Sequence, residues 1–477
     1  MRLRACGWAL LAACQGGQGD ASSASTADST AGTTVVGSSA GPVTTETGAG
    51  TITSAETSTS ETDATAAETT PTTTAATSTT GPASSSTGMS EAETASSDAS
   101  TTGGNEVCGR GIVHVGDLWI TDDTDPATLT CIVEVTGSLH VEDTTTLTSF
   151  ANLADLAMVG HDVFILDNAA LVDLAGLFSL KQVLGEVYGA VVIQDNPALV
   201  DISGLHALEI ADTVSIRGCD ALIDVTGLQG PIVGSEAKEW TLAIGGNDSL
   251  ADLDGLAGLQ DFSGRLIIED NPVLEDISAL ELAIAPTGLD GIYLVDNPAL
   301  IDMVGLDQVT LAREVQLFNN DALISMHGLE GLVASTVNFY VRDNDKLATM
   351  AGLEALETAR VLHIADNPAL TSLAGLDGLT TVTLALAIGA CDVGGNDALV
   401  DLSGLENLTD VESLNINSNG GLTSLAGLDG LTSVALLFIM NNTALPTADA
   451  VALAAQLGVD KPQICNNKGA PAMCLCD

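Results

Sequence analysis

The chain has 477 residues, of which 63 are acidic and 13 basic, and its formal net charge at pH 7 is −50. A surface this acidic repels other polyanions, which disfavours nucleic acid and anionic lipid surfaces as direct partners. Aromatic residues make up 3% of the chain, which indicates a narrow core lined by aliphatic side chains.

The first fourteen residues have the features of a secretory signal. Arg2 and Arg4 precede the short apolar run 5–13, which is too short to span a bilayer as a helix. The sequence Leu-Ala-Ala-Cys at 11–14 resembles the bacterial lipoprotein box, which implies lipidation of Cys14. No acidic residue follows Cys14, so we expect an outer-membrane lipoprotein on the surface of a Gram-negative cell. The alternative is an ordinary signal peptide that contains a cysteine.

Residues 15–106 form a segment of Ser, Thr, Ala and Gly without Lys, Arg, Phe, Tyr or Trp. Such a segment buries too little apolar surface to offset the entropy of ordering, so we expect a disordered linker. As a flexible coil it would span on the order of 50 Å, enough to hold a folded domain away from a membrane.

Residues 107–477 are expected to form one folded domain built from repeats. A phrase of the type Leu-x-Ile-x-Asp-Asn-Pro-x-Leu recurs every 23 to 29 residues, and a repeat of this length is typical of a solenoid. Its alternating apolar residues predict a half-buried strand in each coil. Thirteen positions share the Asn slot of the phrase, and eleven of them hold the asparagines expected to form a structural ladder between coils: Asn168, Asn196, Asn247, Asn271, Asn297, Asn320, Asn344, Asn367, Asn396, Asn419 and Asn442. Thr144 and Cys219 fill the other two slots.

A second signature, Leu-x-Asp-Leu-x-Gly-Leu, follows the first in most coils, as in residues 199–205 and 399–405. The frequent Gly indicates a position that needs a positive φ or a close approach of backbone. The aspartates of this signature are evenly spaced, which is typical of turn chemistry and solubility.

Together the two signatures resemble the receptor L domain, the ligand-binding module of insulin-receptor and epidermal-growth-factor-receptor type ectodomains. They are similar, more distantly, to leucine-rich repeats. The resemblance covers about residues 116–445 and implies an all-β, right-handed parallel β-helix or leucine-rich-like solenoid. The chain departs from the receptors because it lacks their cysteine-rich modules, transmembrane helix and kinase, so a signalling role is not implied.

Both ends of the solenoid are expected to carry caps. Residues 447–457 predict a short helix with Thr447 as N-cap and Gly458 as its stop. Because secretion favours disulfides, we expect Cys108 to pair with Cys131, and Cys465 to pair with Cys474 or Cys476. Cys391 is interpreted as a small buried apolar residue.

No catalytic or metal-binding arrangement stands out. The six histidines appear scattered over unrelated coil positions, and no nucleophile elbow or phosphate loop is present. We therefore predict neither catalytic nor metal-ligand residues and no cofactor, with calcium bound by the Asp columns as an alternative.

Ligand binding is expected at the loops of the longer coils, where insertions bring aromatic and basic residues into an acidic, aromatic-poor domain. The candidate residues are Lys181, Tyr188, Lys238, Trp240 and Tyr293. The alternative is neutral variation in loop length. The favoured function is a lipid-anchored surface solenoid that binds an extracellular protein or glycan, touching the membrane only through its anchor. The other candidate is an extracellular carbohydrate-active β-helix enzyme.

Overall fold

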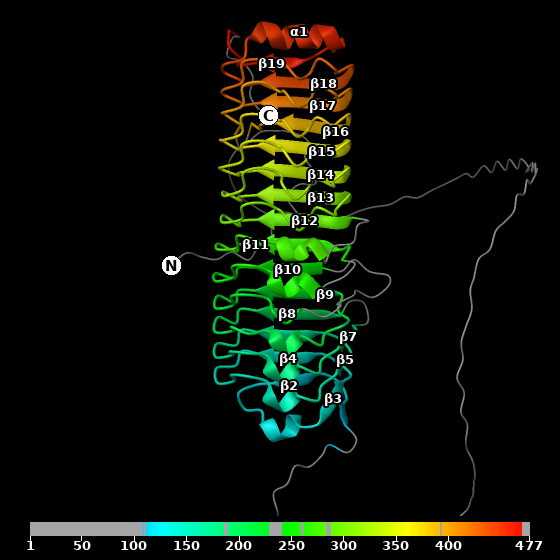
Figure 1. The fold of residues 1–477 in the computed structure, drawn as a ribbon, viewed down its shortest axis with the longest axis vertical. Helices are drawn as coiled ribbons and strands as arrows, with labels where there is room; N and C mark the ends of the chain where they lie inside the picture. The colour runs from blue at the N-terminus through cyan, green and yellow to red at the C-terminus, as the bar shows by residue number, and fades with distance from the viewer. Residues whose placement is uncertain are drawn as a thin grey trace, which may run out of the picture. The chain divides into compact units, whose positions relative to one another are not determined.

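The computed structural model describes Cys108 and residues 111–185, 189–228, 241–258, 262–282, 288–391 and 394–469. Within these residues the chain winds into a stack of parallel strands, with one α-helix at the C-terminal end of the stack (Figure 1). The expected fold class, an all-β parallel solenoid with a short C-terminal helix, is confirmed. In the described part of the chain, no helix combines the length and the apolar character needed to cross a membrane.

One sheet of fifteen strands runs the full length of the stack, and every neighbouring pair in it is parallel. Its strands are β2 (Leu118–Ile120), β4 (Leu139–Glu142), β6 (Val163–Leu166), β8 (Ala190–Gln194), β9 (Thr213–Arg217), β10 (Thr241–Gly245), β11 (Arg265–Glu269), β12 (Leu289–Val295), β13 (Leu311–Phe318), β14 (Ala334–Arg342), β15 (Thr358–Ala365), β16 (Thr381–Ile388), β17 (Asp410–Asn417), β18 (Ser433–Met440) and β19 (Gln463–Cys465).

A second, four-stranded parallel sheet lies in the N-terminal coils only: β1 (Ile112–His114), β3 (Ile132–Val135), β5 (Met158–Val159) and β7 (Gln182–Val183). Short 3₁₀ turns occur in the coils as far as the one that contains β11: η1 (Pro126–Leu129), η2 (Ala151–Leu153), η3 (Ala175–Leu177), η4 (Ser203–Leu205), η5 (Asp254–Gly258) and η6 (Ser278–Leu282). From β12 onward the strands of the large sheet lengthen to between seven and nine residues, except for the three-residue β19.

The core consists of columns of aliphatic side chains stacked in register. One column runs through twelve consecutive strands, and all its members are fully buried: Ile165, Ile193, Ile216, Ile244, Ile268, Leu294, Leu317, Val341, Ile364, Ile388, Ile416 and Ile439. Each such side chain contributes about 1.5–3 kcal/mol by leaving water. The column holds the strand register because a slip of one residue would turn it outward.

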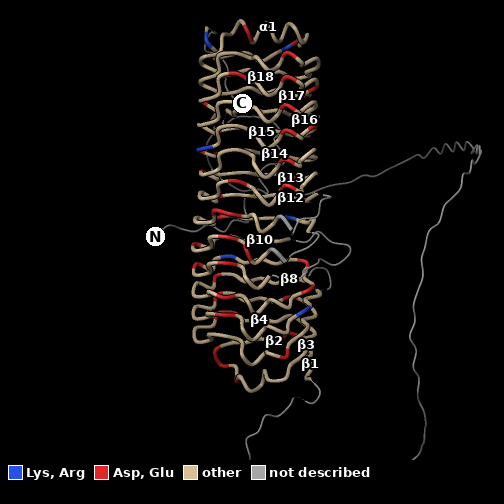
Figure 2. Tube along the Cα trace, viewed as in Figure 1, with Lys and Arg blue, Asp and Glu red and all other residues tan. Residues whose placement is uncertain are grey.

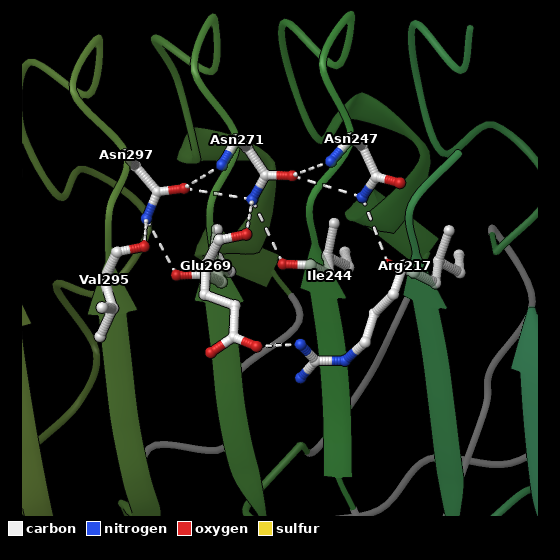
Figure 3. A network of polar contacts seen from close by, with 9 residues as sticks. Arg217, Ile244, Asn247, Glu269, Asn271, Val295 and Asn297 are labelled. Atoms are coloured by element: carbon white, nitrogen blue, oxygen red, sulfur yellow. Dashed lines mark hydrogen bonds and ion pairs between the residues drawn. The ribbon is translucent and has the colours of Figure 1, made fainter. Parts of the chain in front are cut away.

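The recurring asparagines form a chain of hydrogen bonds at the corner after each strand. The side-chain oxygen of Asn297 accepts from the backbone N–H of Asn271 at 3.2 Å, and Asn271 accepts from Asn247 at 3.4 Å (Figure 3). The side-chain NH₂ of Asn297 donates to the carbonyl of Ile268 in the preceding coil at 2.9 Å. Each Asn thus satisfies backbone groups that burial would leave without partners.

Except before Asn396, the residue that precedes each ladder position, and not the ladder residue itself, has the left-handed conformation. Asp143, Asp167, Asp195, Asp270, Asp296, Asn319, Asp343, Asp366, Ser418, Asn441 and Asn466 have φ between 51° and 61°, and Gly218 and Gly246 have φ of 63°. None of the ladder asparagines has a positive φ. Asp and Asn tolerate this region better than other non-glycine residues, which explains the recurring Asp-Asn pair.

The repeated glycine of the second signature has a positive φ in some coils, such as those of Gly227 and Gly328, and not in others. Gly328 has φ 102°, and a Cβ on it would lie 2.0 Å from the backbone carbonyl of Met303. Gly176, in the N-terminal half, has no positive φ, but its Cβ would lie 1.6 Å from the carbonyl oxygen of Phe150. Close packing of the backbone of neighbouring coils therefore requires glycine in both halves.

The solenoid extends one coil beyond the thirteen predicted slots. Asn467, after β19, accepts from the backbone N–H of Asn442 at 3.0 Å and so fills a fourteenth position. This coil was not predicted from the sequence, because a helix, and not the usual second signature, precedes residues 463–467. That helix, α1 (Thr447–Leu457), ends at Gly458 with φ 65°, but its N-cap is Pro446 and not Thr447 as predicted. The Thr447 hydroxyl instead donates to the carbonyl of Lys468.

The described cysteines have different roles. Cys108 and Cys131 form a disulfide that closes the first coil. Cys219 is buried and free in an Asn slot. Cys465 is disulfide-bonded, and both of its expected partners, Cys474 and Cys476, lie outside the described residues. The interpretation of Cys391 as a buried apolar residue is wrong, because Cys391 is exposed and disulfide-bonded.

Candidate functional site

The outward-facing side chains of the fifteen-stranded sheet are here called the outer face. The outer face includes many of the aromatic, histidine and arginine residues of the domain, which are otherwise scarce. Its central row takes one residue from each strand in register: Trp119, His140, Phe164, Val192, Ser215, Ala243, Ile267, Tyr293, Gln316, Tyr340, His363, Ala387, Asn415, Phe438 and Gln463. This row holds five of the 13 Trp, Tyr and Phe residues of the chain. The core does not need them, so their gathering on one outward row indicates a surface used for contact.

At the N-terminal end of the row, three rings stack along the solenoid. The rings of Trp119 and His140 are parallel with centroids 3.9 Å apart, and His140 stacks on Phe164 at 5.1 Å. His140 Nδ1 lies 2.8 Å from Glu142 Oε1, which fixes the imidazole. Trp119 is 54% exposed and lies on the edge strand β2, so it is the accessible member of the stack.

A second ring cluster lies on β13, β14 and β15. Phe318 and Tyr340 have centroids 6.3 Å apart, and Tyr340 meets His363 edge to face at 5.9 Å. The guanidinium of Arg342 lies 5.9 Å from the centroid of the Phe318 ring, within the range of a cation–π contact.

All five arginines in the described residues belong to strands β9 to β15: Arg217, Arg265, Arg313, Arg342 and Arg360. Arg217 pairs with Glu269 across the intervening strand β10 (Figure 3). That crossing depends on Gly245, since a Cβ there would lie 2.9 Å from Glu269 Cγ and 3.2 Å from Arg217 Nη1. Cationic groups, scarce elsewhere in the domain, are therefore concentrated on the outer face.

Next to the second ring cluster, and partly on the same strands, β11 to β14 carry a polar network around Tyr293. The Tyr293 hydroxyl donates to Glu314 at 2.9 Å. Asp290 accepts from Arg265 Nε at 2.8 Å and from Arg313. Burial alone would raise the pKa of Asp290, but the hydrogen bonds from these two guanidiniums outweigh it and lower the pKa. Asp290 is therefore a fixed anion and not a proton donor.

The regular aspartates of the second signature are used in turns. Asp201 Oδ1 accepts from the backbone N–H of Ser203 at 2.7 Å, and Asp401 accepts from Ser403 at 3.0 Å. Asp173, Asp224, Asp252, Asp276 and Asp302 make the same bond to the residue two positions on. Figure 2 shows acidic positions recurring along the stack with few basic ones between them. Turn formation explains the periodicity without a bound metal or a catalytic role.

The left-handed aspartates form a second acidic column beside the ladder, in which like charges meet. Burial raises the pKa of Asp343 to about 6, helped by a hydrogen bond with Asp366 and by repulsion from the Asp366 charge. Burial and the neighbouring Asp195 and Asp143 likewise raise the pKa of Asp167.

Exposure across the outer face differs between its rows. At the C-terminal end, the row beyond the central one is buried although it points outward: Ala365, Asn417, Met440 and Cys465 are all at most 7% exposed. The central row itself stays partly exposed in these coils, as at Asn415 and Phe438.

Of the five predicted ligand-binding residues, the described part of the chain contains Tyr293 and Lys181, which lie in different places on the solenoid. Tyr293 lies on strand β12 of the outer face and not in an inserted loop. Lys181 lies beside β7 of the small sheet, where it pairs with Glu209 at 3.1 Å. Tyr188, Lys238 and Trp240 lie outside the described residues.

Sequence reasoning also missed the central row. His140 and His363 were interpreted as unrelated positions, but they occupy the same row, as the strand register shows. The signal was present, because most members of the row stand four residues before an Asn slot. Aligning the coils on the Asn would have revealed the aromatic column.

Among the described residues, one group has cysteine and carboxylate atoms close enough for a metal: Cys108, Cys131 and Asp155. Both sulfurs are in the disulfide, so neither offers a thiolate.

No family model and no curated protein matches the chain. Among solved structures, the chain is similar to an internalin, InlF, from Listeria monocytogenes, at 16% identity and a TM-score of 0.37, covering 72% of this chain and 84% of that one. At these values the similarity carries no argument about function.

Proposed function

We propose that this protein is a binding or adhesion protein displayed on the cell surface, and that it recognises an extracellular protein or glycan with the outer face of its large sheet. The observation that carries the proposal is the central row. In a chain with 3% aromatic residues, five of them, together with two histidines, stand on one outward row of a rigid sheet.

The geometry suits recognition better than catalysis. The periodic carboxylates are held in turns, and Asp290 on the outer face is kept ionised by two arginines. General acid–base chemistry needs a group that can exchange a proton near the operating pH, in reach of a substrate. Side chains fixed by neighbouring strands, such as the Trp119–His140–Phe164 stack, are preordered for binding.

The N-terminal sequence supports a position outside the cell. A lipid on Cys14 would anchor the protein in the outer membrane, and residues 15–106 would act as the tether that presents the solenoid. Receptor L domains, which the repeat resembles, are ligand-binding modules of ectodomains.

The test of binding uses the full chain with Cys14→Ser, so that it is not lipidated. Labelled protein is incubated with fixed bacterial, fungal, algal and animal cells, and the bound fraction is measured. A face variant carries Trp119→Ala, Tyr293→Ala and Tyr340→Ala. A matched control carries Val172→Ala, Val200→Ala and Ile223→Ala, which removes exposed apolar side chains from the turn edge.

For the cells that the protein with Cys14→Ser alone binds, we expect the face variant to lose at least about tenfold in affinity. The reason is that aromatic anchors contribute much of the binding free energy of an interface. The control should bind normally. Equal binding by both variants would contradict the proposal, and release of soluble sugars from a bound glycan would favour the carbohydrate-active enzyme instead. Anchoring is tested separately by incorporation of labelled palmitate, which Cys14→Ser should abolish.

A further inference from the structure

The Tyr293 network is the part of the outer face in which the chemistry of a ligand can be inferred. It lies near the middle of the large sheet, and its members come from four neighbouring strands, β11 to β14. It departs from the repeat, because the neighbouring strands hold other residue types in register with Arg265, Tyr293, Glu314 and Asn338.

The ring of Tyr293 leans along its own strand, over a glycine. A Cβ on Gly291 would lie 2.5 Å from Tyr293 Cε2 and 3.0 Å from Cζ and the hydroxyl oxygen. A side chain at position 291 would therefore force the ring upright. The ring is half-buried, and its hydroxyl is held by Glu314, so both its position and its tilt are set before any ligand arrives.

Polar groups surround the ring, and each is already positioned by a partner. Glu314 accepts from the Tyr293 hydroxyl through Oε2, and through Oε1 from Gln316 at 3.0 Å and Asn338 at 3.3 Å. On the other side, Asp290 holds the guanidiniums of Arg265 and Arg313. Carboxylate oxygens have about four lone-pair sites, and a guanidinium has five N–H donors, so these groups can bind a ligand without losing their present partners.

The charges of the network balance, because the carboxylates of Asp290 and Glu314 match the guanidiniums of Arg265 and Arg313. A neutral ligand rich in hydroxyl groups suits this arrangement, because an anionic one would also meet the acidity of the whole domain. A protein partner would require a desolvated apolar centre, whereas the side chains around Tyr293 are mainly polar.

We propose that the Tyr293 network is a binding site for a neutral saccharide, with the Tyr293 ring as a stacking platform and Glu314, Asn338 and Arg265 as hydrogen-bonding partners of sugar hydroxyls. This inference rests on the proposed function and names the ligand class. Arg313 and Gln316 are positioning residues, since they hold Asp290 and Glu314 in place.

Binding is measured by calorimetry with the full chain carrying Cys14→Ser. The probes are neutral gluco-, galacto- and manno-oligosaccharides, with oligogalacturonate as the anionic comparator. We expect at least one neutral oligosaccharide to bind and oligogalacturonate to bind more weakly. If no neutral oligosaccharide binds, or if oligogalacturonate binds best, the inference is overturned.

Two variants remove the platform by different routes. Tyr293→Ala deletes the ring, and Gly291→Ala leaves the ring in the chain but displaces it. Each should weaken binding of the neutral oligosaccharide by about tenfold or more, while Tyr293→Phe, which keeps the ring, should lose only about two- to threefold. Phe178→Ala, which removes an exposed ring beside η3 and outside the large sheet, is the matched control and should bind as the unmodified protein does. Folding of each variant is checked by circular dichroism. Unchanged affinity of a folded Gly291→Ala or Tyr293→Ala protein would refute the site.

A third arm separates this inference from the proposed function. Cells that bind the protein are treated either with periodate, which cleaves vicinal diols of sugars, or with trypsin. Loss of binding after periodate alone supports the saccharide site. Loss after trypsin alone overturns the saccharide site but leaves surface binding standing. If no cell type binds the protein, the proposed function fails as well.

Discussion

The Asn ladder and the central row of the outer face lie a few residues apart in every coil, and they differ in almost everything else. The ladder repeats one residue with little change, is fully buried, and saturates the hydrogen bonds of the backbone. The central row changes at nearly every strand and is partly exposed from Trp119 to Tyr340, with Ala243 as a buried exception. The comparison teaches that regular positions in this solenoid maintain the stack, and that irregular positions are free to acquire a binding function.

The largest expected effect comes from breaking the ladder in its middle. Asn320→Ala leaves the backbone N–H of Asn297 and the carbonyl of Leu294 without their buried partners. Each unsatisfied group costs about 1–3 kcal/mol, so we expect the free energy of unfolding to fall by about 2–5 kcal/mol.

The measurement is urea denaturation followed by circular dichroism. Gln316→Ala, in the central row of the same coil, is the control and should change stability by less than about 0.5 kcal/mol. Similar losses of unfolding free energy in the two variants would contradict the idea that the ladder maintains the stack and the central row does not.

Removing the repeated glycine should come next in size. Gly328→Ala places a Cβ 2.0 Å from the backbone of Met303 at a residue with φ 102°. Backbone strain and overpacking together should cost about 2–4 kcal/mol in the same denaturation experiment. Gly458→Ala also has a positive φ but opens onto free space, so it should cost clearly less. An equal loss at both sites would show that φ alone, and not the contact between coils, requires glycine.

Repairing the ladder should stabilise the fold. The thiol of Cys219 accepts from the backbone and side chain of Asn196, and burial raises its pKa to about 12. Cys219→Asn would supply an amide oxygen, which is a stronger acceptor than sulfur. We expect a gain of about 1 kcal/mol by denaturation, and a loss for Cys219→Ala. If Cys219→Asn and Cys219→Ala both lower the free energy of unfolding, this position accommodates the thiol better than an amide.

The smallest expected effect depends on pH. The pKa of Asp343 is raised to about 6 in the folded protein, so its charged form is disfavoured relative to the unfolded chain. Stability tied to this group is complete below about pH 4 and is lost as the pH rises through 6. Because the group is only partly buried, solvent screens it and the loss is about 1 kcal/mol or less. Asp343→Asn should therefore raise the melting temperature more at pH 7.5 than at pH 4. An equal rise at both pH values would contradict the raised pKa of Asp343 beside Asp366.

Much of the fold follows from local chemistry that the sequence displays. The Asn slots, the alternating aliphatic residues and the recurring Gly predict strands, corners and close contacts between coils, and the structure has them. Asn467 escaped prediction because a helix interrupts the repeat before it. Cys391 was misinterpreted because its role depends on the bond that it makes and not on its neighbours in sequence.

By itself, the sequence determined the coil, because each coil repeats the same short-range constraints on φ, on burial and on backbone hydrogen bonds. Only the tertiary structure decided which coils contribute to one surface. Loops of unequal length separate Trp119, Tyr293 and Tyr340 by irregular intervals, and the pairing of neighbouring strands brings them onto one row. The same pairing lays Tyr293 beside Glu314 and Arg265, since a parallel sheet places residues about 4.8 Å apart in space that lie more than twenty apart in the chain.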